Sequence, residues 1–107
     1  MAMWIRSAFW IGAPHNGQDE AFAVAINDEL VPAMRLFPGV SAVRALWPRR
    51  REDAPPAIHC QVIVEFGSDP DMQRMLASTE RLALRPRVKA AVELFNGSIS
   101  HIDYEAT

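Results

Sequence analysis

The sequence predicts an α+β domain whose elements follow the order β-α-β-β-α-β. Strand-like and helix-like hydrophobic periods alternate along the chain, glycine- and proline-rich segments separate them, and half of the 107 residues are hydrophobic. A chain of this length is typical of one globular domain, so residues 1–107 are predicted to form a single domain.

The first strand is predicted from Met3 to Ile11, where the chain is aromatic and β-branched, and residues 12–17 then break it. A helix over residues 18–36 follows, because apolar side chains recur there at intervals of four. Pro32 is expected to kink or restart this helix, since proline removes one amide donor.

Two further strands are predicted at the centre of the chain. Residues 40–47 form the first of these, after Pro38-Gly39 ends the helix, and a charged, proline-bounded loop over residues 48–56 follows. The second runs from Ala57 to Phe66. Its mostly apolar, β-branched character predicts a central strand with both faces covered.

The second helical region is predicted in two pieces. Ser68-Asp69-Pro70-Asp71 is a strong helix start, with a capping side chain followed by a first-turn proline. Ser78-Thr79-Glu80 indicates a second cap, and Pro86 also fits a first-turn position. The helix, whose last apolar position is Phe95, is expected to end at Asn96-Gly97, before a last strand over residues 98–105.

This order of elements is the ferredoxin-like split βαβ motif. Right-handed crossovers put strands 3–11 and 57–66 in the middle of a four-stranded antiparallel sheet. Both helices then cover one face of the sheet, and the chain leaves the other face without cover.

Alternation along each strand divides the side chains between the two faces. We expect the more apolar sets to pack on the helices: Ile5, Ser7, Phe9, Ile11, Cys60, Val62, Val64, Phe66, Ser100, Ile102 and Tyr104. The uncovered face then carries Trp4, Trp10, Ile63 and Ile99 with Arg6, His59, Gln61, His101 and Asp103. A face with two tryptophans predicts an interface, so we expect it to close against a second copy in a two-fold homodimer.

Composition limits the function classes. A formal charge of −2 argues against nucleic-acid binding, which usually needs a basic surface. The single cysteine, Cys60, allows no internal disulfide and no zinc cluster. The apolar run at residues 8–11 is too short for a signal-peptide core or a membrane span. We therefore expect a cytoplasmic protein that binds no membrane, no metal and no cofactor.

Over nearly its whole length the chain resembles the dimeric α/β-barrel superfamily, and within it the EthD-like and stress-responsive barrel proteins. The resemblance rests on Phe22 followed by Asp28-Glu29-Leu30-Val31-Pro32, on Pro38-Gly39-Val40, and on residues 66–72 (FGSDPDM) before the helix break at residues 76–80 (LASTE). EthD-like relatives often carry a histidine two residues before the helix-one proline, where this chain has Leu30.

The resemblance implies a ligand cavity, usually between sheet and helices. Members of the superfamily include cofactor-free monooxygenases, polyketide cyclases, muconolactone isomerases, haem-binding enzymes and proteins of unknown role. An axial histidine is available here for haem, but the sequence has no attachment motif, so haem binding is the least favoured of these functions.

His59 and His101 are the candidate catalytic residues, with Asp103 as a carboxylate that orients an imidazole for general acid–base chemistry. Arg6, on a neighbouring strand, is a candidate for holding an anionic substrate group. The alternative is that these groups form a hydrogen-bonded polar layer at the dimer interface, as buried polar groups require in any case.

The other candidate residues have weaker patterns. Gln61 shares the polar face and is a further substrate-binding candidate, while Ser7 and Tyr104 are expected to line the helix-side cavity as hydrogen-bond donors. Cys60 lies in an apolar strand and fits an inert core thiol better than a nucleophile. Arg49-Arg50-Arg51 precedes two acids and is typical of a solvated loop.

Two functions therefore remain open. The first is a small cofactor-independent enzyme, of monooxygenase, isomerase or cyclase type, that acts on a hydrophobic aromatic or polyketide-like molecule. The second is a non-catalytic dimeric module that binds a small molecule or a partner. Proton transfer by His59 or His101 is what distinguishes the first from the second.

Overall fold

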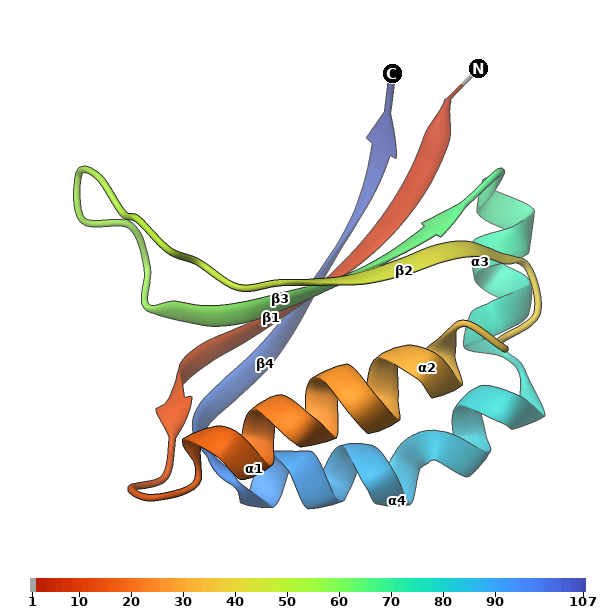
Figure 1. The fold of residues 1–107 in the computed structure, drawn as a ribbon. Helices are drawn as coiled ribbons and strands as arrows, with labels where there is room; N and C mark the ends of the chain where they lie inside the picture. The colour runs from red at the N-terminus through yellow and green to blue at the C-terminus, as the bar shows by residue number, and fades with distance from the viewer. Residues whose placement is uncertain (1) are drawn as a thin grey trace.

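The structure is a computed structural model that describes residues 2–107, which form a four-stranded antiparallel sheet with helices on one of its faces (Figure 1). The elements are β1 (Met3–Pro14), α1 (Asp19–Val24), η1 (Ala25–Leu30), α2 (Val31–Met34), β2 (Val40–Leu46), β3 (Ile58–Phe66), α3 (Asp69–Leu76), α4 (Thr79–Glu93) and β4 (Phe95–Ala106). The strand order β2-β3-β1-β4 confirms the predicted topology, with β1 and β3 in the middle.

The first helical region is one rod in Figure 1, built from α1, η1 and α2. Within η1 the hydrogen-bond spacing widens, so that the amide of Val31 donates to the carbonyl of Ile26. A proline ring clashes with the carbonyl four residues before it, and the wider π-helical turn lies directly before Pro32. Of the two expected outcomes at Pro32, a kink or a restart, the structure has the second, since α-helical hydrogen bonding resumes in α2 from Val31.

Two serine caps divide the second helical region as predicted. The Oγ of Ser68 accepts the Asp71 amide at 3.2 Å, and the Oγ of Ser78 accepts the Arg81 amide at 3.1 Å. Pro86, however, lies inside α4 and does not start a helix. Pro86 has no N–H to donate to the carbonyl of Leu82, four residues before it. Leu82 is exposed to solvent, so water can donate to this carbonyl instead.

The outer strands are longer than the sequence predicts. Gly12 and Gly97, expected in chain breaks, face each other in the β1–β4 ladder, with φ angles of +128° and +156°. A Cβ on either residue would collide with the backbone of the facing strand. Because glycine has none, the ladder continues to Pro14, and Phe95 begins β4 where a helical position was expected.

The assignment of faces predicted for β1 and β4 is wrong, whereas that for Cys60, Val62, Val64 and Phe66 of β3 is confirmed. Trp10 pairs with Cys60 and with Ile99, and all three point toward the helices. Trp10 is 3% exposed in the core, so it is not an interface residue. The two alternating sets of side chains on β1 are both rich in apolar residues. The set with the tryptophans faces the helices, because burying these larger side chains removes more apolar surface from water.

One irregularity also moves His59. The β1–β3 register shifts between Trp10 and Ile11, which pairs with Ile58, and His59 becomes the extra residue of a β-bulge. Its ring turns to the helix side and meets Phe22. The prediction that His59 lies on the uncovered face is therefore wrong.

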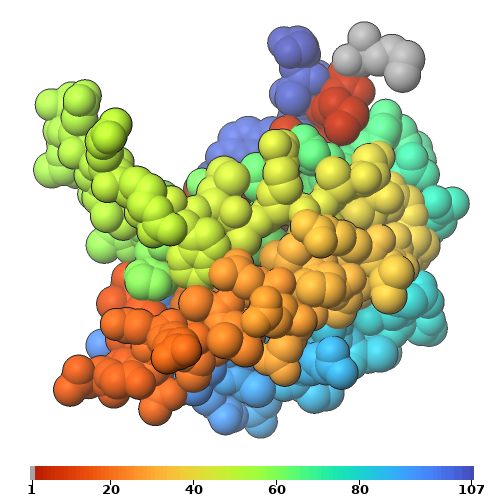
Figure 2. Space-filling model, viewed as in Figure 1, coloured from red at the N-terminus to blue at the C-terminus, as the bar shows by residue number. Residues whose placement is uncertain are grey.

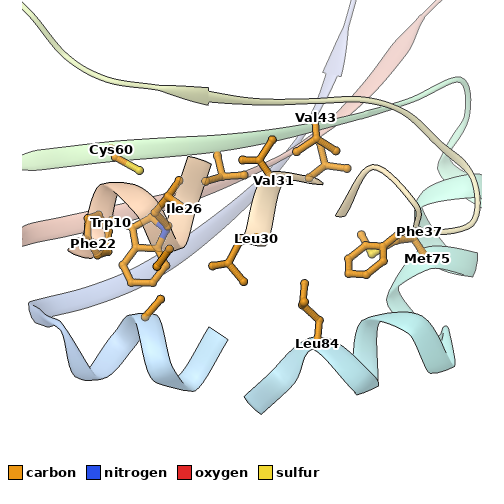
Figure 3. Close-up of a cluster of buried hydrophobic side chains, with 14 of the residues drawn as sticks. Trp10, Phe22, Ile26, Leu30, Val31, Phe37, Val43, Cys60, Met75 and Leu84 are labelled. Carbon is orange, nitrogen blue, oxygen red and sulfur yellow. The ribbon is translucent and has the colours of Figure 1, made fainter. Parts of the chain in front are cut away.

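Side chains fill one end of the layer between sheet and helices (Figure 3). We call this the aromatic end and define it by Trp10, Phe22, Trp47, His59 and Phe95. The ring of Phe22 lies 5.0 Å from that of Trp10 in an edge-on arrangement and 5.0 Å from that of Phe95. Such contacts hold the start of the first helical region against the sheet.

The β2–β3 connection is irregular over residues 47–57, where the sequence predicted a loop over residues 48–56. Trp47 packs against Phe22 of α1, whereas the exposed part, residues 49–57, stands out from the body of the molecule in Figures 1 and 2, away from the helices. Within residues 2–107, every helix is too short or too polar to cross a membrane.

Candidate functional site

A cavity of about 480 Å³ lies between the sheet and the helices. Its sheet wall is mainly apolar and is formed by Ala8, Trp10, Val62, Val64 and Ile99. Its helical wall includes Leu30, Met34, Leu84, Val88 and Val92. In Figure 3, Leu30 and Leu84 point from different helices into the space beneath the sheet. Such a cavity suits a small apolar molecule.

Basic side chains line the same cavity, and we call this region the cationic end. It is defined by Arg6 on β1, His101 on β4, and Arg81, Arg85 and Lys89 on α4. Among residues 2–107, the lining includes no aspartate or glutamate. Arg6 and His101 were predicted from the sequence as site residues, whereas the three α4 residues were not, although their spacing of four places them on one face of a helix.

Three of the predicted site residues share one face of the sheet. Arg6 pairs with Asp103 across β1 and β4, and its Nη1 donates to the Asp103 carboxylate at 2.9 Å. His101 lies two residues before Asp103 on β4, so its side chain is on the same face, and it lines the cavity. This face is the helix side, so the expectation that all three lie on the uncovered face is wrong.

The surroundings of His101 favour its neutral form. Partial burial lowers the pKa of His101 below its ordinary value of 6.5, and the positive charges of Arg6 and Arg81 lower it further. The carboxylate of Asp103 acts in the opposite direction. His101 is therefore unprotonated at neutral pH and can accept a proton.

His59 lies apart from this group. Its ring is 5.6 Å from Phe22, 5.9 Å from Trp47 and 5.9 Å from Phe95, at steep angles to all three. It belongs to the aromatic end and does not line the cavity. The two histidines therefore do not form one acid–base pair in the cavity.

Ser7, Gln61 and Tyr104 lie on the uncovered face. The Nε2 of Gln61 donates to the Oγ of Ser7 at 2.8 Å, and Ser7 is fully buried among its neighbours. Tyr104 is 41% exposed. The expectation that Ser7 and Tyr104 line the helix-side cavity is wrong, because the alternation on β1 and β4 is opposite to the predicted one. Gln61 lies on the face predicted for it.

Cys60 lies in the core, and burial raises the pKa of its thiol to about 12. The thiol is protonated at neutral pH, which agrees with a core role. Among the described residues, no group of three or more histidine, cysteine, aspartate or glutamate side chains is placed to hold a metal ion.

No protein-family model matches the chain, and no curated protein sequence does. Solved structures do match it. An EthD-family protein from Bacillus halodurans C-125 has a TM-score of 0.74 at 12% identity, over 100% of both chains.

Two further structures have the same fold. SnoaB, a cofactor-independent oxygenase from Streptomyces nogalater, has a TM-score of 0.60 at 17% identity, over 99% of this chain and 92% of its own. A dimeric ferredoxin-like protein of unknown function from Jannaschia sp. CCS1 has a TM-score of 0.64 at 17% identity, over 97% and 99%. These matches confirm the ferredoxin-like fold that the sequence predicts.

Proposed function

We propose that this chain is a small cofactor-independent enzyme that acts on an apolar, aromatic or polyketide-like molecule in the cavity between sheet and helices. His101 carries this proposal, because it is a titratable group in the wall of a largely apolar cavity of suitable size. The description of the neighbour SnoaB as a cofactor-independent oxygenase supports the same class of activity.

Proton transfer is the chemistry that this arrangement suits. The neutral imidazole of His101 takes a proton from a phenol or from a carbon next to a carbonyl, and the electron pair stays on the substrate as a phenolate or enolate. Arg6, fixed by its ion pair with Asp103, stabilises the negative charge that develops. The protonated His101 then returns the proton to another carbon, or to the alkoxide that forms when the enolate carbon closes a ring on an internal carbonyl. With dioxygen as the oxidant, the anion forms a carbon–oxygen bond to it, the resulting peroxide takes that proton, and loss of water leaves a new carbonyl, as in a quinone.

Native mass spectrometry of the protein from crude lysate tests this proposal first, because it detects a retained small molecule and reports the oligomeric state. We expect a retained molecule of aromatic or polyketide type. The variant His101→Gln should retain the molecule but convert it at least about a hundredfold more slowly, the usual loss for a general base. Equal conversion by the variant would favour the non-catalytic binding module.

We also propose that the uncovered sheet face pairs with a second copy of the chain. This face carries apolar side chains from β1, β3 and β4, namely Ile5, Phe9, Ile11, Ile63 and Ile102. Polar side chains such as Ser7 and Gln61 lie between them, but Ile102 is 47% exposed, and exposed apolar side chains gathered on one face usually mark an interface. The description of one neighbour as dimeric supports this pairing.

Sedimentation velocity tests the pairing with two single variants, each of which replaces an exposed apolar residue by glutamate. Ile102→Glu should give a monomer, because it would bury a charge in the interface. Leu36→Glu is the matched control, since Leu36 is 82% exposed at the end of the first helical region. A dimer that persists in Ile102→Glu, or a monomeric wild-type protein, would overturn the proposed pairing.

A further inference from the structure

The helix α4 presents two adjacent rows of side chains to the cavity. Leu84, Val88 and Val92 form an apolar row at intervals of four, and Arg81, Arg85 and Lys89 form a basic row at the same interval. Residues four apart lie on one face of a helix, so each row is continuous. Across the width of α4 the wall of the cavity therefore changes from apolar to basic.

The basic row meets further positive groups from the sheet. Arg6 on β1 and His101 on β4 line the same cavity as Arg81 and Arg85. The chain as a whole has a formal charge of −2, so this concentration of positive charge is local and does not reflect the composition.

Among the described residues, the protein's own carboxylates form an ion pair with only one of these basic groups, Arg6. Asp103 pairs with Arg6, and the Nη1 of Arg81 donates to the backbone carbonyl of Leu76 at 3.2 Å. Among residues 2–107, neither Arg81 nor Arg85 forms an ion pair with an acidic side chain. Partial burial lowers the pKa of Arg81, as do the nearby charges of Arg6 and Arg85. Like charges held together in a partly desolvated site favour an anion between them.

We propose that the cavity selects amphipathic monoanions, with an apolar aromatic body against the apolar row of α4 and a carboxylate or similar acidic head on Arg81 and Arg85. This inference rests on the proposed function and specifies its substrate class. Guanidinium groups suit a carboxylate because they donate two parallel hydrogen bonds to it. Arg81 and Arg85 are then specificity-determining residues, which leaves Arg6 for the charge that develops during proton transfer.

A matched pair of fluorescent probes tests the inference. The probe 8-anilinonaphthalene-1-sulfonate carries a sulfonate, which represents the acidic head of the proposed ligand. N-phenyl-1-naphthylamine has the same aromatic body without the sulfonate. We expect the wild-type protein to bind the anionic probe about tenfold more tightly, and this preference should fall as salt is added. Arg81→Gln and Arg85→Gln should each weaken binding of the anionic probe about tenfold and leave the neutral probe unaffected.

Arg87→Gln is the control, because Arg87 lies on the same helix but lines a different groove. It should keep the wild-type preference. Unchanged affinity for the neutral probe shows that a variant keeps its cavity, so a folding defect cannot imitate the expected result. Equal affinities for the two probes in the wild-type protein would overturn the anion inference and leave the proposed function standing. Binding of neither probe would overturn both.

Discussion

The aromatic end and the cationic end belong to the same layer between one sheet and its helices, yet they are built differently. At the aromatic end, rings from β1, α1, β3 and β4 pack against one another, mostly edge to face, and fill the space. At the cationic end, aliphatic side chains of α4 leave a cavity of about 480 Å³, and arginines and a histidine line it. Trp10 contributes to both ends and separates them. One end thus holds the fold together, and the other has room for a ligand.

The largest expected difference between the two ends is in the loss of stability when one side chain at each end is truncated to alanine. Phe22→Ala should lower the free energy of unfolding by about 3–5 kcal/mol, because Phe22 is fully buried among other rings. Val88→Ala should cost about 1 kcal/mol or less, because one side of Val88 already faces the cavity. Urea denaturation of both variants measures the difference. Similar losses at the two positions would show that the cavity is filled in solution.

The two histidines give a second, smaller contrast. His59→Gln should cost about 1–2 kcal/mol of stability, because the ring contacts with Phe22, Trp47 and Phe95 are lost. His101→Gln should change stability by about 0.5 kcal/mol or less at neutral pH, since His101 lies in the cavity wall and not in the packed core. Thermal unfolding of both variants checks this. A larger loss for His101→Gln would mean that His101 is a structural residue.

The smallest expected effect is a dependence of stability on pH. The pKa of His101 in the folded protein lies below 6.5, so the unfolded chain binds a proton first as the pH falls. The contribution of His101 is fully present above pH 6.5 and is lost as the pH falls through the folded-state pKa. As the pH is lowered from about 7 to about 5, the denaturation midpoint should therefore fall less steeply in His101→Gln than in the wild-type protein. An identical slope in variant and wild type would contradict this account of His101.

The sequence predicted the topology well because its signals are local. The caps at Ser68 and Ser78 and the restart at Pro32 are decided by a few neighbouring residues, and the structure has all three. Pro86 is the exception, since solvent at the outer face of α4 lets the helix continue through it.

The composition of the site was harder to predict, because it depends on which way each strand faces. On β1 both alternating sets are apolar enough to be core, and the packing of Trp10 against Phe22 and Phe95 decides between them. The bulge that turns His59 inward depends on how β1 and β3 pair and not on a local sequence signal. Arg6, His101 and Asp103 were correctly grouped on one face because they occupy paired positions, but they were placed on the wrong face of the sheet.

Chemical-shift mapping by NMR tests the central claim most directly, which is that the cationic end is the ligand site. Titration of the labelled protein with 8-anilinonaphthalene-1-sulfonate should move the signals of His101, Val88 and Ile99 most strongly, because these residues line the cavity. The largest shifts at Ser7, Ile102 and Tyr104 would contradict the claim, because they would place the ligand on the uncovered face of the sheet.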